Sequence, residues 1–159
     1  MKKLVFALMA VAAMCACQKS SAPVDFNYRG LAFTLPVSQF VDSMVARGFA
    51  VDSAASDSGN NVVLASPAEH YRVLAAFKGE QLTVIQETYN LSTNDSTRQM
   101  WQEIRDGLEK ELGAWPDCPI LKDDHKQANF DAGNGLISVL LENTYTPTLT
   151  VRYTKKDGK

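Results

Sequence analysis

One compact group of residues could bind a metal ion: Asp123-Asp124-His125. A zinc site needs three or four carboxylate, imidazole or thiolate ligands that converge on one ion. Three adjacent residues on a regular element point in different directions, and the other histidine of the chain is the distant His70. We therefore interpret this group as a solvated loop and predict no metal site.

Other patterns that could support catalysis are equally incomplete. Asp57-Ser58-Gly59-Asn60-Asn61 has the composition of a calcium loop, but it lacks the alternating acidic positions and the terminal glutamate, so we interpret it as a turn. No glycine-rich phosphate loop follows a predicted strand, and no serine lies in a nucleophile-elbow pattern. We predict no catalytic residue and no cofactor. The alternative is an enzyme that these patterns do not detect.

The thiol chemistry of the chain rests on Cys15, Cys17 and Cys118. A nucleophilic thiol needs an activating base, and the nearest histidine to Cys118 in the sequence is His125. Cys118 lies in the segment Trp115-Pro116-Asp117-Cys118-Pro119, and we assign it a structural or incidental role. If the other two cysteines leave or are modified, no intrachain disulfide forms.

Residues 1–17 have the pattern of a bacterial export signal: Lys2 and Lys3, then an apolar run from residue 4 to residue 16. That run is shorter than the ~20 residues of a spanning helix, which makes a retained anchor helix the weaker interpretation. The segment resembles the signal of bacterial lipoproteins, because Ala16 precedes Cys17 and the apolar Met14 replaces the more usual leucine. The resemblance implies cleavage before Cys17 and lipidation of its thiol. The alternative is an ordinary cleaved signal and a soluble periplasmic protein.

The resemblance also implies a location in the outer membrane, because Gln18 rather than aspartate would follow the lipidated cysteine. No acidic run follows, so we expect the protein to face the periplasm. Residues 18–24 would form a short tether and residues 25–159 a single domain. Loss of Lys2 and Lys3 lowers the basic count from 16 to 14, against 18 acidic residues, and the charges are mixed along the chain. This pattern gives no indication of nucleic-acid binding.

Two helices are predicted from apolar residues at helical spacing. The first follows a strand over residues 26–35, starts at Pro36 and ends at Gly48, with Phe49 folding back on it. The second opens near Ser96, with Gln99 as a capping-box partner, and Gly113 ends it. The predicted buried stripes are Val37, Phe40, Val41, Met44 and Val45 in the first helix and Trp101, Ile104, Leu108 and Leu112 in the second.

Alternating segments predict three strands after each helix. After the first helix they cover residues 61–65, 70–78 and 82–89, and after the second they cover 126–130, 136–142 and 148–154. The predicted fold class is therefore α+β, with two helices packed on one face of an antiparallel sheet and a pseudo-repeat of helix plus three strands. An all-β sandwich is the alternative.

A two-residue turn at Gly79-Glu80 predicts the register of the first hairpin: Phe77 pairs with Leu82, Ala75 with Val84 and Val73 with Gln86. These pairs, Gln86 excepted, would form an apolar face, with Arg72, Lys78, Thr83 and Glu87 on the other face and Arg72 opposite Glu87. In the second half Leu141 would pair with Leu149, Val139 with Val151 and Ile137 with Tyr153. That register places Ser138, Glu142, Thr148, Thr150 and Arg152 on the polar face.

The order of elements resembles small lipoproteins of Bacteroidetes with a tandem helix-plus-sheet domain, similar to the β-lactamase-inhibitor-protein-like and PepSY-like folds. The phrases that carry the resemblance are Arg29-Gly30-Leu31, Phe40-Val41-Asp42-Ser43-Met44-Val45 and Arg47-Gly48-Phe49. It implies recognition through an exposed sheet face or an edge rather than catalysis.

We therefore predict a lipid-anchored, non-catalytic binding or assembly module with a protein partner in the envelope. The predicted partner-binding residues are Arg72, Lys78, Glu87, Ser138, Glu142, Thr150 and Arg152. The alternative is a carrier of a lipid or metabolite, or an undetected enzyme, with a pocket between helices and sheet. Its lining would come from Phe40, Met44, Phe77 and Trp101, which the first interpretation places in the core.

Overall fold

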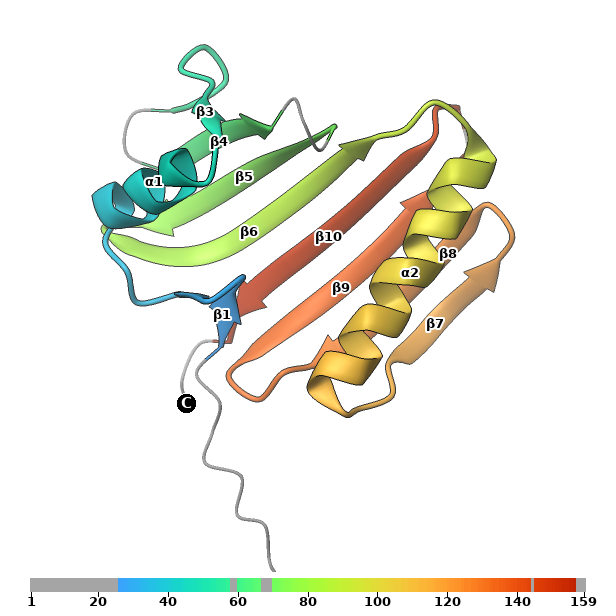
Figure 1. Ribbon diagram of the computed structural model, residues 1–159. Coiled ribbons are helices and arrows are strands. Elements are labelled where there is room, and N and C mark those ends of the chain that lie inside the picture. Colours follow the sequence, from blue (N-terminus) through green and yellow to red (C-terminus); the bar gives the residue numbers. More distant parts are fainter. Residues whose placement is uncertain (1–25, 58–59, 67–69, 144, 157–159) are drawn as a thin grey trace, which may run out of the picture.

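The computed structural model describes residues 26–57, 60–66, 70–143 and 145–156. The predicted signal, Cys17 and the tether lie outside these residues. Within them the chain is α+β, with two helices and an eight-stranded sheet in which all neighbouring strands are antiparallel (Figure 1). This confirms the predicted α+β class, with two helices and an antiparallel sheet, and excludes the all-β alternative.

The strands of the large sheet follow the order β3-β4-β5-β6-β10-β9-β8-β7, so that β6 and β10 lie at its centre. Their bounds are Ala50–Val51 (β3), Asn61–Ser66 (β4), Tyr71–Lys78 (β5), Gln81–Asn90 (β6), Asp117–Lys122 (β7), His125–Asp131 (β8), Gly135–Glu142 (β9) and Thr148–Lys155 (β10). Two of these strands, β3 and β7, are absent from the prediction. Each helix is thus followed by four strands, and the predicted count of three was wrong.

Helix α1 spans Val37–Ala46 and begins directly after Pro36, whose fixed φ and missing N–H suit the start of a helix. It ends as predicted: the amides of Gly48 and Phe49 donate to the carbonyls of Val45 and Met44, a Schellman motif. Phe40 and Met44 are buried, whereas Val45, predicted as buried, is 49% exposed.

Helix α2 spans Asn94–Leu112 and begins earlier than predicted. Its N-cap is Thr93, whose hydroxyl accepts from the amide of Ser96 at 3.1 Å. The side chain of Gln99 donates to Glu103 instead of completing a capping box at Ser96. The predicted stripe is correct, because Trp101 and Leu108 are buried and Ile104 and Leu112 pack against the core.

Before α1, the predicted strand over residues 26–35 is a small hairpin instead. It consists of β1 (Asn27–Tyr28) and β2 (Leu31–Ala32), joined by Arg29 and Gly30 in left-handed conformations with φ of 50° and 80°. The hairpin contributes the buried ring of Tyr28, which packs edge-on against Tyr153 of β10, and the buried ring of Phe33 follows directly after β2.

A bulge changes the register of the β5–β6 hairpin. Phe77 pairs with Leu82 as predicted, but Thr83 is then an extra residue on β6, and Ala76 pairs with Val84. The Thr83 hydroxyl donates to the carbonyl of Ala76 at 3.1 Å. Beyond the bulge every predicted pair was wrong by one residue: Ala75 pairs with Ile85, and Val73 pairs with Glu87. One extra residue in a strand moves every residue after it to the side of the sheet opposite to the one expected from a regular ladder.

Both helices and the β1–β2 hairpin lie on the same side of the large sheet (Figure 1). We call this side the covered face; α2 packs on it over β8, β9 and β10. The buried core lies between helices and sheet, and it includes Phe40, Met44, Val73, Ile85, Trp101, Phe130, Val139, Leu141, Leu149 and Val151. The predicted pairs Leu141–Leu149, Val139–Val151 and Ile137–Tyr153 are confirmed.

Candidate functional site

The other side of the sheet, which we call the open face, has no helix on it among the described residues (Figure 1). The strand register arranges its side chains in two central rows. One row contains Ala65, Arg72, Thr88, Thr150, Leu140, Gln127 and Ile120. The other contains Val63, Leu74, Gln86, Arg152, Ser138, Asn129 and Asp117.

Two arginines supply positive charge near the middle of these rows. Arg72 on β5 and Arg152 on β10 are both exposed, and β6 lies between them. The residues paired with Arg72 are Ala65 and Thr88, and those paired with Arg152 are Gln86 and Ser138. Neither guanidinium makes an ion pair within the described parts of the chain.

Amides and a hydroxyl form a local network next to Arg152. Ser138 donates to the side-chain oxygen of Asn129 at 2.8 Å, and the amide nitrogen of Gln127 donates to the same oxygen at 3.0 Å. The side chains are thus held in place by one another on β8 and β9. This part of the open face is polar, ordered and uncharged.

Aliphatic side chains occupy the positions between these polar groups. Leu74, Val84 and Leu140 are half-buried on the open face, and Val63 is buried there although no helix covers it. The tyrosines and phenylalanines of β5, β6, β8 and β10 point instead to the covered face. Apolar contact area with a few arginines among it is the composition that protein interfaces favour near their centre.

Both edges of the sheet are poor templates for strand addition. β3 has two residues, and β7 carries Pro119, which has no N–H to donate, next to a register shift between Asp117 and Ile120. Short edge strands, prolines and bulges all oppose pairing with an additional strand. Of the two recognition modes that the sequence suggested, the geometry favours the face over the edge.

The structure places six of the seven predicted partner-binding residues on the open face. Thr150, Arg152, Ser138 and Arg72 lie near its centre, and Lys78 and Glu142 lie at strand ends. Glu87 was placed wrongly: the bulge at Thr83 turns it to the covered face, where it is 2% exposed.

Glu87 is the centre of a buried polar cluster that the sequence analysis missed. Its Oε1 accepts from the hydroxyl of Tyr28 at 2.7 Å and from Nη2 of Arg29 at 3.0 Å, and its Oε2 accepts from the hydroxyl of Tyr89 at 2.9 Å. The Arg29 guanidinium also stacks over the ring of Tyr71. The cluster fastens the β1–β2 hairpin to the centre of the sheet, which is a structural role.

Burial and this carboxylate shift the ionisation of the surrounding groups. Burial first, and then the charge of Glu87, raise the pKa of both Tyr28 and Tyr89 far above the ordinary tyrosine value. Burial is the largest single effect on Arg29 and lowers its pKa, but Glu87 and the neighbouring tyrosines together outweigh it and the net change is upward. The tyrosines therefore stay protonated as donors, and Arg29 stays charged.

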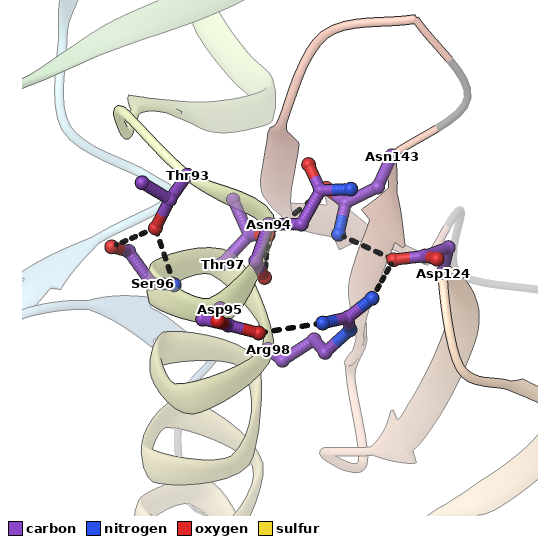
Figure 2. A network of polar contacts seen from close by, with 8 residues as sticks. All are labelled: Thr93, Asn94, Asp95, Ser96, Thr97, Arg98, Asp124 and Asn143. Atoms are coloured by element: carbon purple, nitrogen blue, oxygen red, sulfur yellow. Dashed lines mark hydrogen bonds and ion pairs between the residues drawn. The ribbon is translucent and has the colours of Figure 1, made fainter.

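Of the group Asp123-Asp124-His125, the structure places Asp124 in a polar network with the first turns of α2. Asp124 accepts from Arg98 at 2.6 Å and from Asn143 at 3.1 Å, and the hydroxyl of Thr97 bonds Asn143 at 2.9 Å (Figure 2). The hydrogen bond from Asn143, followed by the contact with Arg98, lowers the pKa of Asp124. Within the described residues no three histidine, cysteine or acidic side chains gather as metal ligands would.

The residues proposed to line a pocket between helices and sheet are packed instead. Phe40, Met44, Phe77 and Trp101 all lie in the buried core. A shallow hollow of about 350 Å³ lies elsewhere, at the side of α1 near β3 and β4. Its lining is Val41, Val51, Val62, Ser53, Ser56, Asp57 and Asn61.

No helix in the described part of the chain combines the length and apolar character needed to cross a bilayer. Comparison with known proteins yields no match: no family model fits the chain, and no curated protein or solved structure is significantly similar to it. The resemblance to lipoproteins with β-lactamase-inhibitor-protein-like or PepSY-like domains therefore stays a prediction, and the function must be argued from the geometry.

Proposed function

We propose that this protein is a lipid-anchored, non-catalytic module of the bacterial outer membrane that binds a protein partner through the open face of its sheet. The observation that carries the proposal is the open face itself. It combines half-buried aliphatic side chains with two exposed arginines that have no ion-pair partner among the described residues. Such a surface resembles the centre of an interface more than an ordinary solvated face.

The test is a photocrosslinking residue in place of Thr150, which lies two residues from Arg152 on β10 and in the same row as Arg72. Irradiation of intact cells should attach one envelope protein to this position. The same substitution at Gln102, exposed on α2, is the control and should give no such product. The crosslink should weaken when Arg72 and Arg152 are both changed to Gln. Equal yields at Thr150 and Gln102 would contradict the proposed surface, whereas an unchanged yield in the double variant would show only that the two arginines do not contribute to binding.

The membrane anchor is proposed from Ala16 and Cys17 in the sequence. Cys17→Ser should abolish labelling by a palmitate analogue and move the protein from the membrane fraction to the soluble periplasm. Cys15→Ser is the matched control and should remain in the membrane. The opposite pattern, with Cys15→Ser released and Cys17→Ser retained, would show that the lipid is attached to Cys15 and would contradict the proposed anchor.

We also infer that the two halves of the domain are copies of one helix-plus-sheet unit. The support is the order of the elements: α1 precedes β3–β6, α2 precedes β7–β10, and the second group occurs in reverse order across the sheet. The unit has four strands rather than the three expected from the sequence.

The alternative function, a carrier of a lipid or metabolite, has one supporting observation, the hollow beside α1. Three of its lining residues are valines, which suits an apolar ligand. Native mass spectrometry of the protein released gently from membranes would detect such cargo. A bound small molecule that disappears in Val62→Asp, together with no crosslink at Thr150, would favour the carrier.

A further inference from the structure

We propose that the partner of the open face is an acidic protein surface, which brings carboxylates to Arg72 and Arg152. This inference rests on the proposed function and names the chemistry of the partner. It follows from the contrast between these two arginines and the other arginines of the described chain.

The other guanidinium groups are engaged within the molecule. Arg29 pairs with Glu87, Arg98 with Asp95 and Asp124, and Arg105 with Asp106 and Glu109. The Arg47 guanidinium donates to the carbonyl of Arg29. The chain carries 18 acidic residues against 16 basic ones, so carboxylates are available for pairing. Two arginines left without a carboxylate near the centre of a single face form a site of positive potential on an otherwise acidic molecule.

The open-face carboxylates lie away from these arginines. Asp131, at the end of β8, accepts from Lys156 at 2.7 Å, and Asp117 lies on the edge strand β7. Glu142 is at the end of β9, opposite Thr148 rather than an arginine. The central positive charge is therefore not neutralised from its own face.

The register gives the spacing that a partner must match. Arg72 and Arg152 are two strands apart and offset by two residues along the strands. With roughly 4.8 Å between strands and 3.4 Å per residue, their Cα atoms are about 12 Å apart. Two carboxylates eight residues apart on one helix are separated by about the same distance, at 1.5 Å per residue.

The composition of the face favours a protein over an anionic membrane. Attraction to acidic lipids typically needs clusters of about 4–8 basic residues, whereas Lys78 and Lys122, which the register also places on the open face, lie at strand ends away from the two arginines. Here the side chains around the two arginines are Ala65, Leu74, Gln86, Thr88, Ser138, Leu140 and Thr150. Neutral polar and aliphatic groups around isolated arginines match a protein surface, where bidentate pairing with carboxylates gives specificity.

The first arm of the test measures binding of the full-length chain, in a non-ionic detergent, to two immobilised peptides. One consists of four Glu-Ala-Ala-Ala repeats, and the other has glutamine in place of each glutamate. We expect at least tenfold tighter binding of the glutamate peptide, and loss of that difference in Arg72→Gln with Arg152→Gln. The control, Arg47→Gln with Lys110→Gln, also removes two exposed positive charges, both at helices on the covered side, and should retain it. Equal binding of the two peptides, or equal losses in both double variants, would overturn the inference.

The second arm tests whether the negative charge that binds the arginines comes from an anionic lipid instead of a protein. Short-chain phosphatidylglycerol added to the glutamate peptide assay should not displace the peptide at concentrations that leave the protein folded. Displacement that depends on Arg72 and Arg152, with no preference for the glutamate peptide, would overturn the inference in favour of a membrane surface. A crosslink at Thr150 that survives the loss of both arginines would refute the acidic partner yet still place a protein on this face. The absence of any crosslink would refute the proposed function itself.

Discussion

The two faces of the sheet use arginine in opposite ways. On the covered face, Arg29 lies against the buried carboxylate of Glu87, and two tyrosine hydroxyls complete the hydrogen bonds of that carboxylate. On the open face, Arg72 and Arg152 make no ion pair with any described residue. Arg72 and Glu87 lie on neighbouring strands, yet they face opposite sides.

Solvent explains this difference. A buried carboxylate loses its hydration, and its free energy rises steeply unless several donors replace the lost water. An exposed guanidinium keeps its water, so leaving it without a protein partner costs little. The cluster around Glu87 therefore stabilises the fold, whereas Arg72 and Arg152 are free to contact another molecule. Four predictions test this division, starting with the largest expected effect.

Replacing Glu87 with alanine should destabilise the protein by about 3–5 kcal/mol, because two buried tyrosine hydroxyls lose their acceptor, at about 1–3 kcal/mol each, and the half-exposed Arg29 loses its ion pair. The partners left behind are Arg29, Tyr28 and Tyr89. Urea unfolding followed by circular dichroism measures the change. Glu87→Gln keeps the shape and one acceptor oxygen and should be less destabilising than Glu87→Ala. If Glu87→Ala lowered the free energy of unfolding by less than about 1 kcal/mol, the cluster on the covered face would not stabilise the fold, and its polar groups would not differ in role from those of the open face.

Replacing Tyr28 with phenylalanine should cost about 1.5–3 kcal/mol, the range for a hydrogen bond to a charged group. The ring contacts with Phe40 and Tyr153 would remain, so the change isolates the hydroxyl that bonds Glu87. Tyr145→Phe is the matched control, since Tyr145 is almost fully exposed, and its midpoint of urea unfolding should not move. Equal effects of the two substitutions would show that the hydroxyl of Tyr28 does not hold the hairpin.

The stability of the protein should fall as the pH rises above about 10. Burial raises the pKa of Tyr28, Tyr89 and Tyr153, and Glu87 adds to each shift. Above the ordinary tyrosine pKa the unfolded chain releases these protons while the folded chain keeps them, so ionisation favours unfolding. Each such tyrosine contributes a slope of about 1.4 kcal/mol per pH unit in the free energy of unfolding.

Urea unfolding of the wild type and Tyr28→Phe between pH 9 and pH 11 separates this contribution from that of the lysines. The variant should lose stability less steeply, by the slope of one tyrosine. Parallel curves would mean that Tyr28 ionises equally in both states and is not protected by the cluster.

Periodicity predicted the parts of the fold in which the ladder is regular. The alternation in β9 and β10 gave the pairs Leu141–Leu149 and Val139–Val151, and helical spacing gave the buried stripe of α2. The predicted positions of Arg72, Thr150 and Arg152 on the open face are confirmed for the same reason. Whether they bind a partner stays a prediction.

The failures occur where a single residue interrupts the period. Thr83 has no sequence signal that distinguishes a bulge from a ladder position, and the error moved Glu87 to the wrong face. One clue was available in the second half of β6. If Tyr89 is assigned to the buried face, the alternation of a strand places Glu87 and Ile85 on that face too, as the structure does. The strand β7 was missed because its residues, with Pro119 among them, lack the regular alternation that predicted the other strands, although an edge strand tolerates proline.

The smallest expected effect belongs to the open face. Changing Arg72 and Arg152 together to glutamine should alter the free energy of unfolding by no more than about 0.5 kcal/mol, because both side chains are exposed and break no ion pair within the described chain. The same variant should weaken binding of the crosslinked partner by more than about 1 kcal/mol, since arginine is enriched at binding hot spots. Urea unfolding and a binding isotherm on the same preparation provide both numbers. A variant that unfolds easily would mean that these arginines support the fold, as Arg29 does on the covered face. A variant that is both stable and fully active in binding would show that Arg72 and Arg152 are ordinary solvated side chains that contribute nothing to the interface.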